Sequence, residues 1–232
     1  MALPLYGSRP AWGAPDFSPF VIKLETWLRM ASIPYERRDG GNPMKAPKGK
    51  LPYVELDGKH VGDSQLVLEE LTRRHGVTLD AGMSPAEAAT ARAVRRMLEE
   101  GTYFCTLRLR WLEEDGWAEQ YPAFAKMFPA FVAPIVVPLI RNKVRSAAQA
   151  QGVGRHTREE VIAIAAADLA AVQALLGEQA YLFGDAPRSV DATLYAFLTA
   201  IQTHPGTTAV HLAARSAPFL AYTQRIRDRY WA

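Results

Sequence analysis

The chain of 232 residues contains one cysteine, Cys105, so it cannot form an intramolecular disulfide, and a reducing compartment is expected. Its N-terminus lacks a basic flank followed by an apolar core. It also lacks an uninterrupted apolar run of the ~20 residues that a membrane span needs. Residues 128–140 come nearest, but Pro129, Pro134 and Pro138 interrupt them. We therefore expect a cytoplasmic protein without a membrane span.

Neither positive nor negative charge dominates the sequence. The net charge is +3, and lysine and arginine are interspersed with aspartate and glutamate. The densest basic group consists of Arg92, Arg95, Arg96, Arg108 and Arg110. It lacks the interleaved aromatic residues of a nucleic-acid surface, so solvated helix faces are the simpler interpretation. The five histidines do not have the spacing of metal ligands. We expect no nucleic-acid partner and no metal.

Nearly half of the residues are apolar, which is enough for a sizeable core, and the length suits a small domain followed by a larger one. Short strand patterns and helical patterns alternate until Gly76, where a basic last turn meets a glycine C-cap. Residues 77–83 form the expected linker. The fold class is therefore α+β, with a mixed domain at residues 1–76 and an all-helical domain at residues 84–232.

Two capping boxes mark helix starts in the second domain, at Ser84 and at Thr157. Apolar spacing predicts a long helix from the first box to about Asp115. We expect a proline-broken turn at residues 116–131 and a bent helix over 132–148. Further helices are predicted behind Thr157 to residue 176 and over residues 191–203 and 218–230.

The most informative segment covers residues 50–65. Asp57-Gly58 separates two short strand patterns and is the dipeptide that best suits a type I′ hairpin turn. Asp63-Ser64 then stands at an N-cap, ahead of the apolar periodicity of the next helix. The backbone N–H groups of a helix N-terminus, a serine hydroxyl and an upstream loop proline can together hold the carboxylate of an extended peptide.

This arrangement resembles the glutathione-binding half of glutathione S-transferases. In that superfamily a thioredoxin-like domain (βαβ-ββα) carries a cis-proline loop and a helix that opens with an acidic-Ser pair, positions that Pro52 and Asp63-Ser64 occupy here. Residues 18–30 more specifically resemble the metaxin and failed-axon-connections branch. Residues 184–192 are similar to the segment that caps the buried helix of the C-terminal domain, but Arg188 stands where the family usually carries Ser or Thr. The resemblance implies an N-terminal thioredoxin-like domain followed by an all-α C-terminal domain.

The resemblance also implies glutathione as co-substrate and a residue that ionises its thiol. A thiol with a pKa near ~8.5 needs about 2.7 kcal/mol of preferential thiolate stabilisation for a shift of ~2 units. Ser18 is the first candidate for the thiol contact, because it precedes Pro19 where related branches carry cysteine. Tyr6, at the end of the first strand, is the alternative. Ser18 also suits a plain N-cap, and the two roles can coexist.

For the rest of glutathione, the resemblance implies that Ser64 holds the γ-glutamyl carboxylate and that Asp63 faces the α-amino group. A plain helix cap is the alternative for this pair. Leu51 would offer its backbone to the cysteinyl part, with Pro52 in the cis form. Lys50, or its neighbour Lys48, would reach the glycyl carboxylate.

The expected reaction is attack of the thiolate on a small hydrophobic electrophile by a homodimeric transferase. The alternative is a non-catalytic ligand-binding or protein-interaction module of the metaxin-like type. The second substrate would lie between the domains, near Tyr103, Leu107, Arg108 and Trp111, which receive no chemical roles. We expect Cys105 to be a packed, inert thiol.

Overall fold

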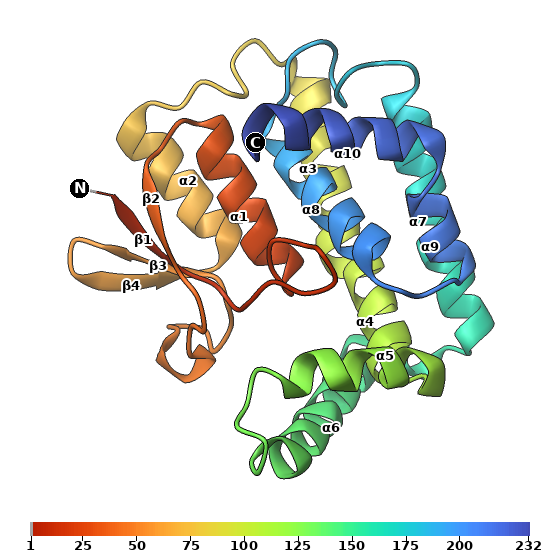
Figure 1. The fold of residues 1–232 in the computed structure, drawn as a ribbon. Coiled ribbons are helices and arrows are strands. Elements are labelled where there is room, and N and C mark those ends of the chain that lie inside the picture. Colours follow the sequence, from red (N-terminus) through yellow and green to blue (C-terminus); the bar gives the residue numbers. More distant parts are fainter. Residues whose placement is uncertain (1) are drawn as a thin grey trace.

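The computed structural model describes residues 2–232 and contains a small sheet next to a larger helical part (Figure 1). The sheet has the order β2-β1-β3-β4. Strand β1 (Leu3–Tyr6) runs parallel to β2 (Tyr35–Arg38) and antiparallel to β3 (Tyr53–Leu56), which pairs antiparallel with β4 (Lys59–Gly62). Asp57 and Gly58 have φ values of 52° and 73°, which confirms the predicted type I′ geometry of the hairpin turn.

The strand register brings three chain segments to one end of the sheet. Tyr6 pairs with Tyr53, and Tyr53 pairs with Gly62. The segment that follows β1, the segment that precedes β3 and the segment that follows β4 therefore leave the sheet at the same end. These are the segments that carry the candidate binding residues.

Helices α1 (Pro19–Met30) and α2 (Ser64–His75) pack against the sheet. Side chains alternate across a strand, so Leu3 and Leu5 face the helices while Tyr6 points to the other face. Burial of these apolar side chains stabilises the domain by roughly 1.5–3 kcal/mol per large residue. The core of this layer contains Leu5, Leu24, Trp27, Leu28, Val54, Val67 and Leu71, each fully buried.

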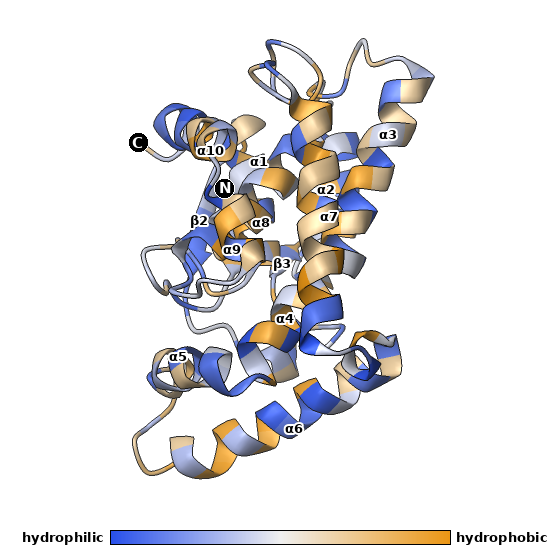
Figure 2. Cartoon of the chain, turned by 90° about the vertical axis from the view of Figure 1, so that its right-hand side faces the viewer, coloured by the Kyte–Doolittle hydropathy of each residue, from blue (hydrophilic) through white to orange (hydrophobic). Residues whose placement is uncertain are grey.

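Every strand precedes residue 63, and helices dominate the rest of the described chain. These helices are α3 (Pro85–Arg96), α4 (Tyr103–Trp111), α5 (Glu114–Ala125), α6 (Ala133–Gln151), α7 (Arg158–Leu176), α8 (Ser189–Thr203), α9 (Ala209–Ala214) and α10 (Ala217–Tyr230). Helix α8 lies in the centre and packs against α1 of the first part (Figure 1). Helices α5 and α6 form a separate layer below the others in Figure 2. Within residues 2–232, no helix combines the length and the apolar character that crossing a membrane requires.

The structure corrects two predictions in this region. The expected long helix contains a π-helical segment, Met97–Thr102, between α3 and α4, and α4 ends at Trp111. The turn predicted at residues 116–131 is wrong, because α5 occupies most of it with Pro122 inside the helix. Its aromatic side chains pack on α4, with Trp117 and Phe124 5.8 Å and 4.9 Å from Trp111 between ring centroids. Tertiary packing outweighs the helical hydrogen bond that proline removes.

Helix α8 is anchored by Asp191, which is fully buried. Its carboxylate accepts hydrogen bonds from the backbone N–H groups of Leu182 (3.1 Å) and Arg188 (2.7 Å) and from the Tyr222 hydroxyl (2.8 Å). The backbone group of Arg188 thus engages the aspartate, although the side chain there departs from the family pattern. Asp191 stabilises the fold and belongs to no cleft.

Candidate active site

The site centres on the N-terminus of α1. Ser18 is the N-cap residue, Pro19 is the first helical residue, and the Ser18 side chain makes no capping hydrogen bond. The Ser18 backbone N–H donates to the Asp16 carboxylate over 2.7 Å. Asp16, rather than the Ser18 hydroxyl, thus organises the helix start, and the hydroxyl is not used by the cap.

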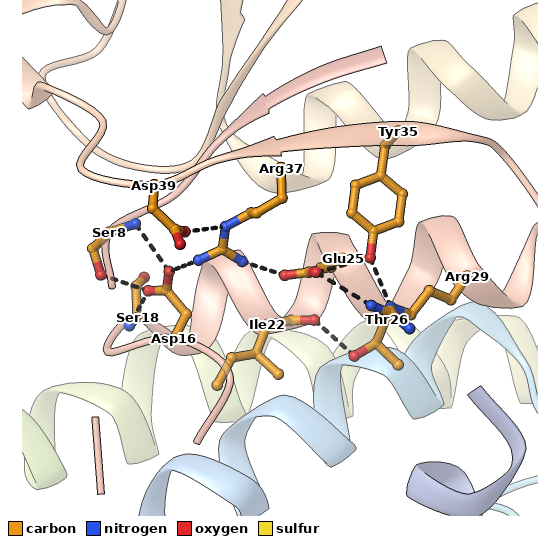
Figure 3. A network of polar contacts seen from close by, with 10 residues as sticks. All are labelled: Ser8, Asp16, Ser18, Ile22, Glu25, Thr26, Arg29, Tyr35, Arg37 and Asp39. Atoms are coloured by element: carbon orange, nitrogen blue, oxygen red, sulfur yellow. Dashed lines mark hydrogen bonds and ion pairs between the residues drawn. The ribbon is translucent and has the colours of Figure 1, made fainter. Parts of the chain in front are cut away.

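A buried network holds this helix start in place (Figure 3). Arg37 on β2 pairs with Asp16, with Glu25 on α1 and, over 2.7 Å, with Asp39. Asp16 also accepts hydrogen bonds from the backbone N–H (2.9 Å) and the hydroxyl (2.6 Å) of Ser8. Burial raises the pKa of Asp16 to about 6, so its carboxylate is still ionised at neutral pH. The network fixes both ends of the loop between β1 and α1.

Sequence reasoning missed this network, since Asp16 and Arg37 belong to no recognised motif. One local signal was available in Gly7, directly after β1. A Cβ atom on Gly7 would lie 2.7 Å from the Arg37 guanidinium, closer than side chains approach. Glycine at this position lets the guanidinium cross the strand end and reach Asp16.

The N-terminus of α2 supplies the second part of the site. Asp63 is its N-cap residue, with a φ of 81°, and its Oδ1 accepts from the backbone N–H groups of Gln65 (2.9 Å) and Leu66 (3.2 Å). Ser64 is the first helical residue and is 5% exposed. Asp63 therefore caps the helix through one carboxylate oxygen. The Ser64 hydroxyl takes no part in the cap.

The loop before β3 forms the third part. The Leu51–Pro52 peptide bond is cis, as the sequence analysis expected. Leu51 is half-buried and lies outside the strand, where none of the backbone hydrogen bonds among residues 2–232 engages it. Lys50 is exposed beside it, after Gly49. An extended peptide could therefore pair with the Leu51 backbone at this end of the sheet.

Tyr6 lies on the opposite face of the sheet from α1. Its ring stacks on Tyr53, with 4.4 Å between the ring centroids, and its hydroxyl accepts a 2.8 Å hydrogen bond from Arg38. The structure thus gathers Ser18, the Leu51–Pro52 loop and the Asp63-Ser64 pair at one end of the sheet and directs the Tyr6 hydroxyl elsewhere.

A buried ion pair links this region to the helical part. Lys23 on α1 is fully buried and donates to Glu99 over 2.6 Å and to the side-chain oxygen of Gln65 over 2.8 Å. Glu99 lies in the π-helical segment and also pairs with Arg95 over 2.8 Å. Burial lowers the pKa of Lys23, whereas Glu99 opposes this shift. Lys23 thus connects the start of α2 to the helical part.

Two other residue classes contribute no site. Cys105 is buried in α4, and burial raises the pKa of its thiol to about 11, so it is a poor nucleophile. Among the residues that the structure describes, no group of three or more His, Cys, Asp or Glu side chains is placed to hold a metal ion.

The sheet topology, the cis-proline loop and the helical second part define the class of protein. A family model described as "Glutathione S-transferase N-terminal domain" matches residues 19–116, and one described as "Glutathione S-transferase, C-terminal domain" matches residues 165–226. The chain belongs to the glutathione S-transferase superfamily, with a thioredoxin-like N-terminal part and a helical C-terminal part.

Among curated proteins, the chain is 33% identical over 235 residues to isoprene-epoxide–glutathione S-transferase from Rhodococcus sp. (strain AD45), covering 97% of this chain and 98% of that protein. It is 26% identical to failed axon connections from Drosophila melanogaster, covering 80% and 46%, respectively. It is 25% identical to mouse (Mus musculus) metaxin-1, covering 81% and 61%. The chain thus spans nearly all of the first relative and less than two thirds of the other two.

Solved structures share the fold at low sequence identity. A glutathione S-transferase from Methylobacterium radiotolerans, in complex with glutathione sulfonate, matches with a TM-score of 0.64 at 16% identity, covering 98% of this chain and 91% of that one. A beta-etherase from a Sphingobium strain matches with a TM-score of 0.63 at 18% identity, covering 98% and 95%.

Proposed function

We propose that the protein is a glutathione transferase that activates the glutathione thiol for attack on a small hydrophobic electrophile. The observation that carries the proposal is the uncommitted Ser18 hydroxyl at the start of α1, at the same sheet end as Leu51 and Ser64. The extent of the similarity to a glutathione S-transferase that acts on an epoxide supports the same reaction type.

The interactions available at the start of α1 are strong enough to lower the pKa of the glutathione thiol by the required amount. A hydrogen bond from Ser18 to a thiolate is worth about 1.5–3 kcal/mol. The dipole of α1 adds about 0.3–1 kcal/mol at its N-terminus. Together they match the ~2.7 kcal/mol that lowers a thiol pKa by ~2 units. Ser64 with Asp63 would hold the γ-glutamyl end, Leu51 and Pro52 the cysteinyl part, and Lys50 the glycyl carboxylate.

The test compares Ser18→Ala with Tyr6→Phe in chlorodinitrobenzene conjugation. We expect Ser18→Ala to lower kcat/KM by about 10–100-fold, because one charge-assisted hydrogen bond to the thiolate is lost. An ultraviolet titration of bound glutathione should show a raised thiol pKa in the same variant. Tyr6→Phe should leave both readouts close to wild type. Full activity of Ser18→Ala would remove Ser18 from the mechanism.

The second candidate function is a non-catalytic binding module, favoured by the similarity to failed axon connections and metaxin-1. Glutathione-affinity retention without turnover of any electrophile would favour it. A homodimer and a cytoplasmic location are further proposals by family analogy. Sedimentation and fractionation of the tagged chain test them.

A further inference from the structure

A small buried cavity lies against the first residue of α1. Its volume is about 10 Å³, and its wall includes Pro19 on α1, Arg110 on α4, Phe197 on α8 and His204 just after α8. This volume accommodates about one oxygen atom of the size of water. Pro19 directly follows Ser18, the residue proposed to contact the glutathione sulfur.

Two residues of the cavity wall, Arg110 and His204, carry hydrogen-bond donors. Arg110 is 9% exposed and forms no ion pair within residues 2–232. Its Nε donates to the Gln120 side-chain oxygen over 3.2 Å. Among the described residues, the Gln120 amide nitrogen and His204 Nε2 are buried without a hydrogen-bond partner.

The protonation state of His204 follows from its neighbours. Its Nδ1 accepts a hydrogen bond from the Gly206 backbone N–H over 3.1 Å. Burial and the nearby Arg110 charge lower the pKa of His204 to about 3, so the ring is neutral at physiological pH. A neutral imidazole that accepts at Nδ1 carries its proton on Nε2. His204 Nε2 is therefore a donor.

The Arg110 charge is compensated only in part. The guanidinium carbon lies 5.1 Å from the ring centre of Phe17 and 5.5 Å from that of Trp12, both on the loop before α1. Such cation–π contacts are favourable, but a buried charge without an anionic partner remains costly. A small, electron-rich acceptor in the cavity would be stabilised by the Arg110 charge and by the His204 N–H group.

We propose that Arg110 and His204 bind the oxygen of an epoxide substrate and stabilise the alkoxide that forms when glutathione opens the ring. This inference rests on the proposed function. The thiolate sulfur forms a bond to a ring carbon, the carbon–oxygen bond breaks, and its electron pair stays on oxygen. The alkoxide then takes a proton from water, and the proton released earlier by the thiol neutralises the hydroxide. Donors held at such a developing charge typically contribute about 10²–10³ in rate.

Arg108 is the arginine expected near the second substrate, without a chemical role. Arg108 pairs with Glu113 and donates to the backbone oxygen of His156 over 3.0 Å, so both terminal nitrogens of its guanidinium already have partners. Arg110 lies two residues further along α4 and has no carboxylate partner within the described residues. The available cation is therefore Arg110.

The binding test uses two glutathione conjugates that differ in one hydroxyl, S-(hydroxypropyl)glutathione and S-propylglutathione, measured by calorimetry on the full chain. We expect the wild type to prefer the hydroxylated conjugate about tenfold, which corresponds to ~1.4 kcal/mol. Arg110→Met should abolish the preference. The control Arg96→Met removes an equal charge from an exposed position of α3 and should retain it.

A turnover test gives a second readout. Arg110→Met should lower kcat/KM for styrene oxide about 100-fold. It should lower kcat/KM for chlorodinitrobenzene less than tenfold, because the negative charge that forms on this substrate is spread over its nitro groups. If Arg110→Met does not fold, the same comparison of the two electrophiles is made with His204→Phe, which keeps an aromatic ring against Trp12. Equal affinities of the wild type for the two conjugates, or equal losses with both electrophiles, would overturn the inference and leave the proposed function standing. If the wild type binds no glutathione, both are overturned.

Discussion

Two buried imidazoles make the stability of the folded chain depend on pH. His204 and His211 stack with 5.3 Å between their ring centroids. Burial, reinforced by the charges of nearby arginines, lowers their pKa values to about 3 and about 4. Histidines of the unfolded chain keep a pKa near ~6.5. Between these values the unfolded chain binds more protons than the folded chain, so stability falls as the pH is lowered through this window.

We predict that the free energy of unfolding drops by about 2 kcal/mol per histidine between pH ~7 and ~5. Denaturant unfolding at a series of pH values measures this slope. His204→Gln should reduce the slope by about half, whatever its effect on stability at neutral pH. An unchanged slope in this variant would show that His204 is protonated in the folded chain.

At the scale of single elements, α8 depends on the Asp191 carboxylate. Asp191→Ala leaves two backbone N–H groups without their acceptor, and the Tyr222 hydroxyl keeps only the backbone oxygen of residue 191, at 3.2 Å. We expect a loss of about 3–5 kcal/mol in the free energy of unfolding. The matched control is Asp185→Ala, an exposed aspartate in the loop before α8, which should change stability by less than ~0.5 kcal/mol. Similar melting temperatures for the two variants would contradict this role of Asp191.

Local chemistry made several elements predictable from sequence. Asp57-Gly58 identified the hairpin turn, and Ser84 and Thr157 identified helix starts, where both capping boxes are present. Helix α5 was missed because Pro122 suggested a break and the aromatic contacts that stabilise the helix come from α4. Helix α9, Ala209–Ala214, is too short to produce a periodic signal.

The candidate site was predictable only where it follows local motifs. Ser18 and the Asp63-Ser64 pair stand at helix starts that the sequence marks by proline, polar caps and apolar spacing. The Asp16–Arg37 pair and the Arg110–His204 cluster join residues distant in the chain. Their chemistry arises from burial and proximity, which neither composition nor spacing reveals.

For the molecule as a whole, the Lys23–Glu99 pair connects the thioredoxin-like part to the helical part. Lys23→Met leaves Glu99 buried with Arg95 as its remaining partner, and we expect a loss of about 3 kcal/mol in the free energy of unfolding. The double variant Lys23→Met/Glu99→Met should recover part of this loss, because it removes the buried carboxylate as well. Additive losses in a double-mutant cycle would mean that the pair is not coupled.

In the proposed function, glutathione binds where α1, the cis-proline loop and α2 meet. Calorimetric titration of glutathione into wild type, Ser64→Ala and Ser146→Ala tests it most directly, since Ser146 is an exposed serine on α6. We predict one site per chain with a Kd below about 1 mM, weakened about tenfold or more by Ser64→Ala and unchanged by Ser146→Ala. Dilution heats alone with the wild type, or equal affinities for all three proteins, would contradict the claim.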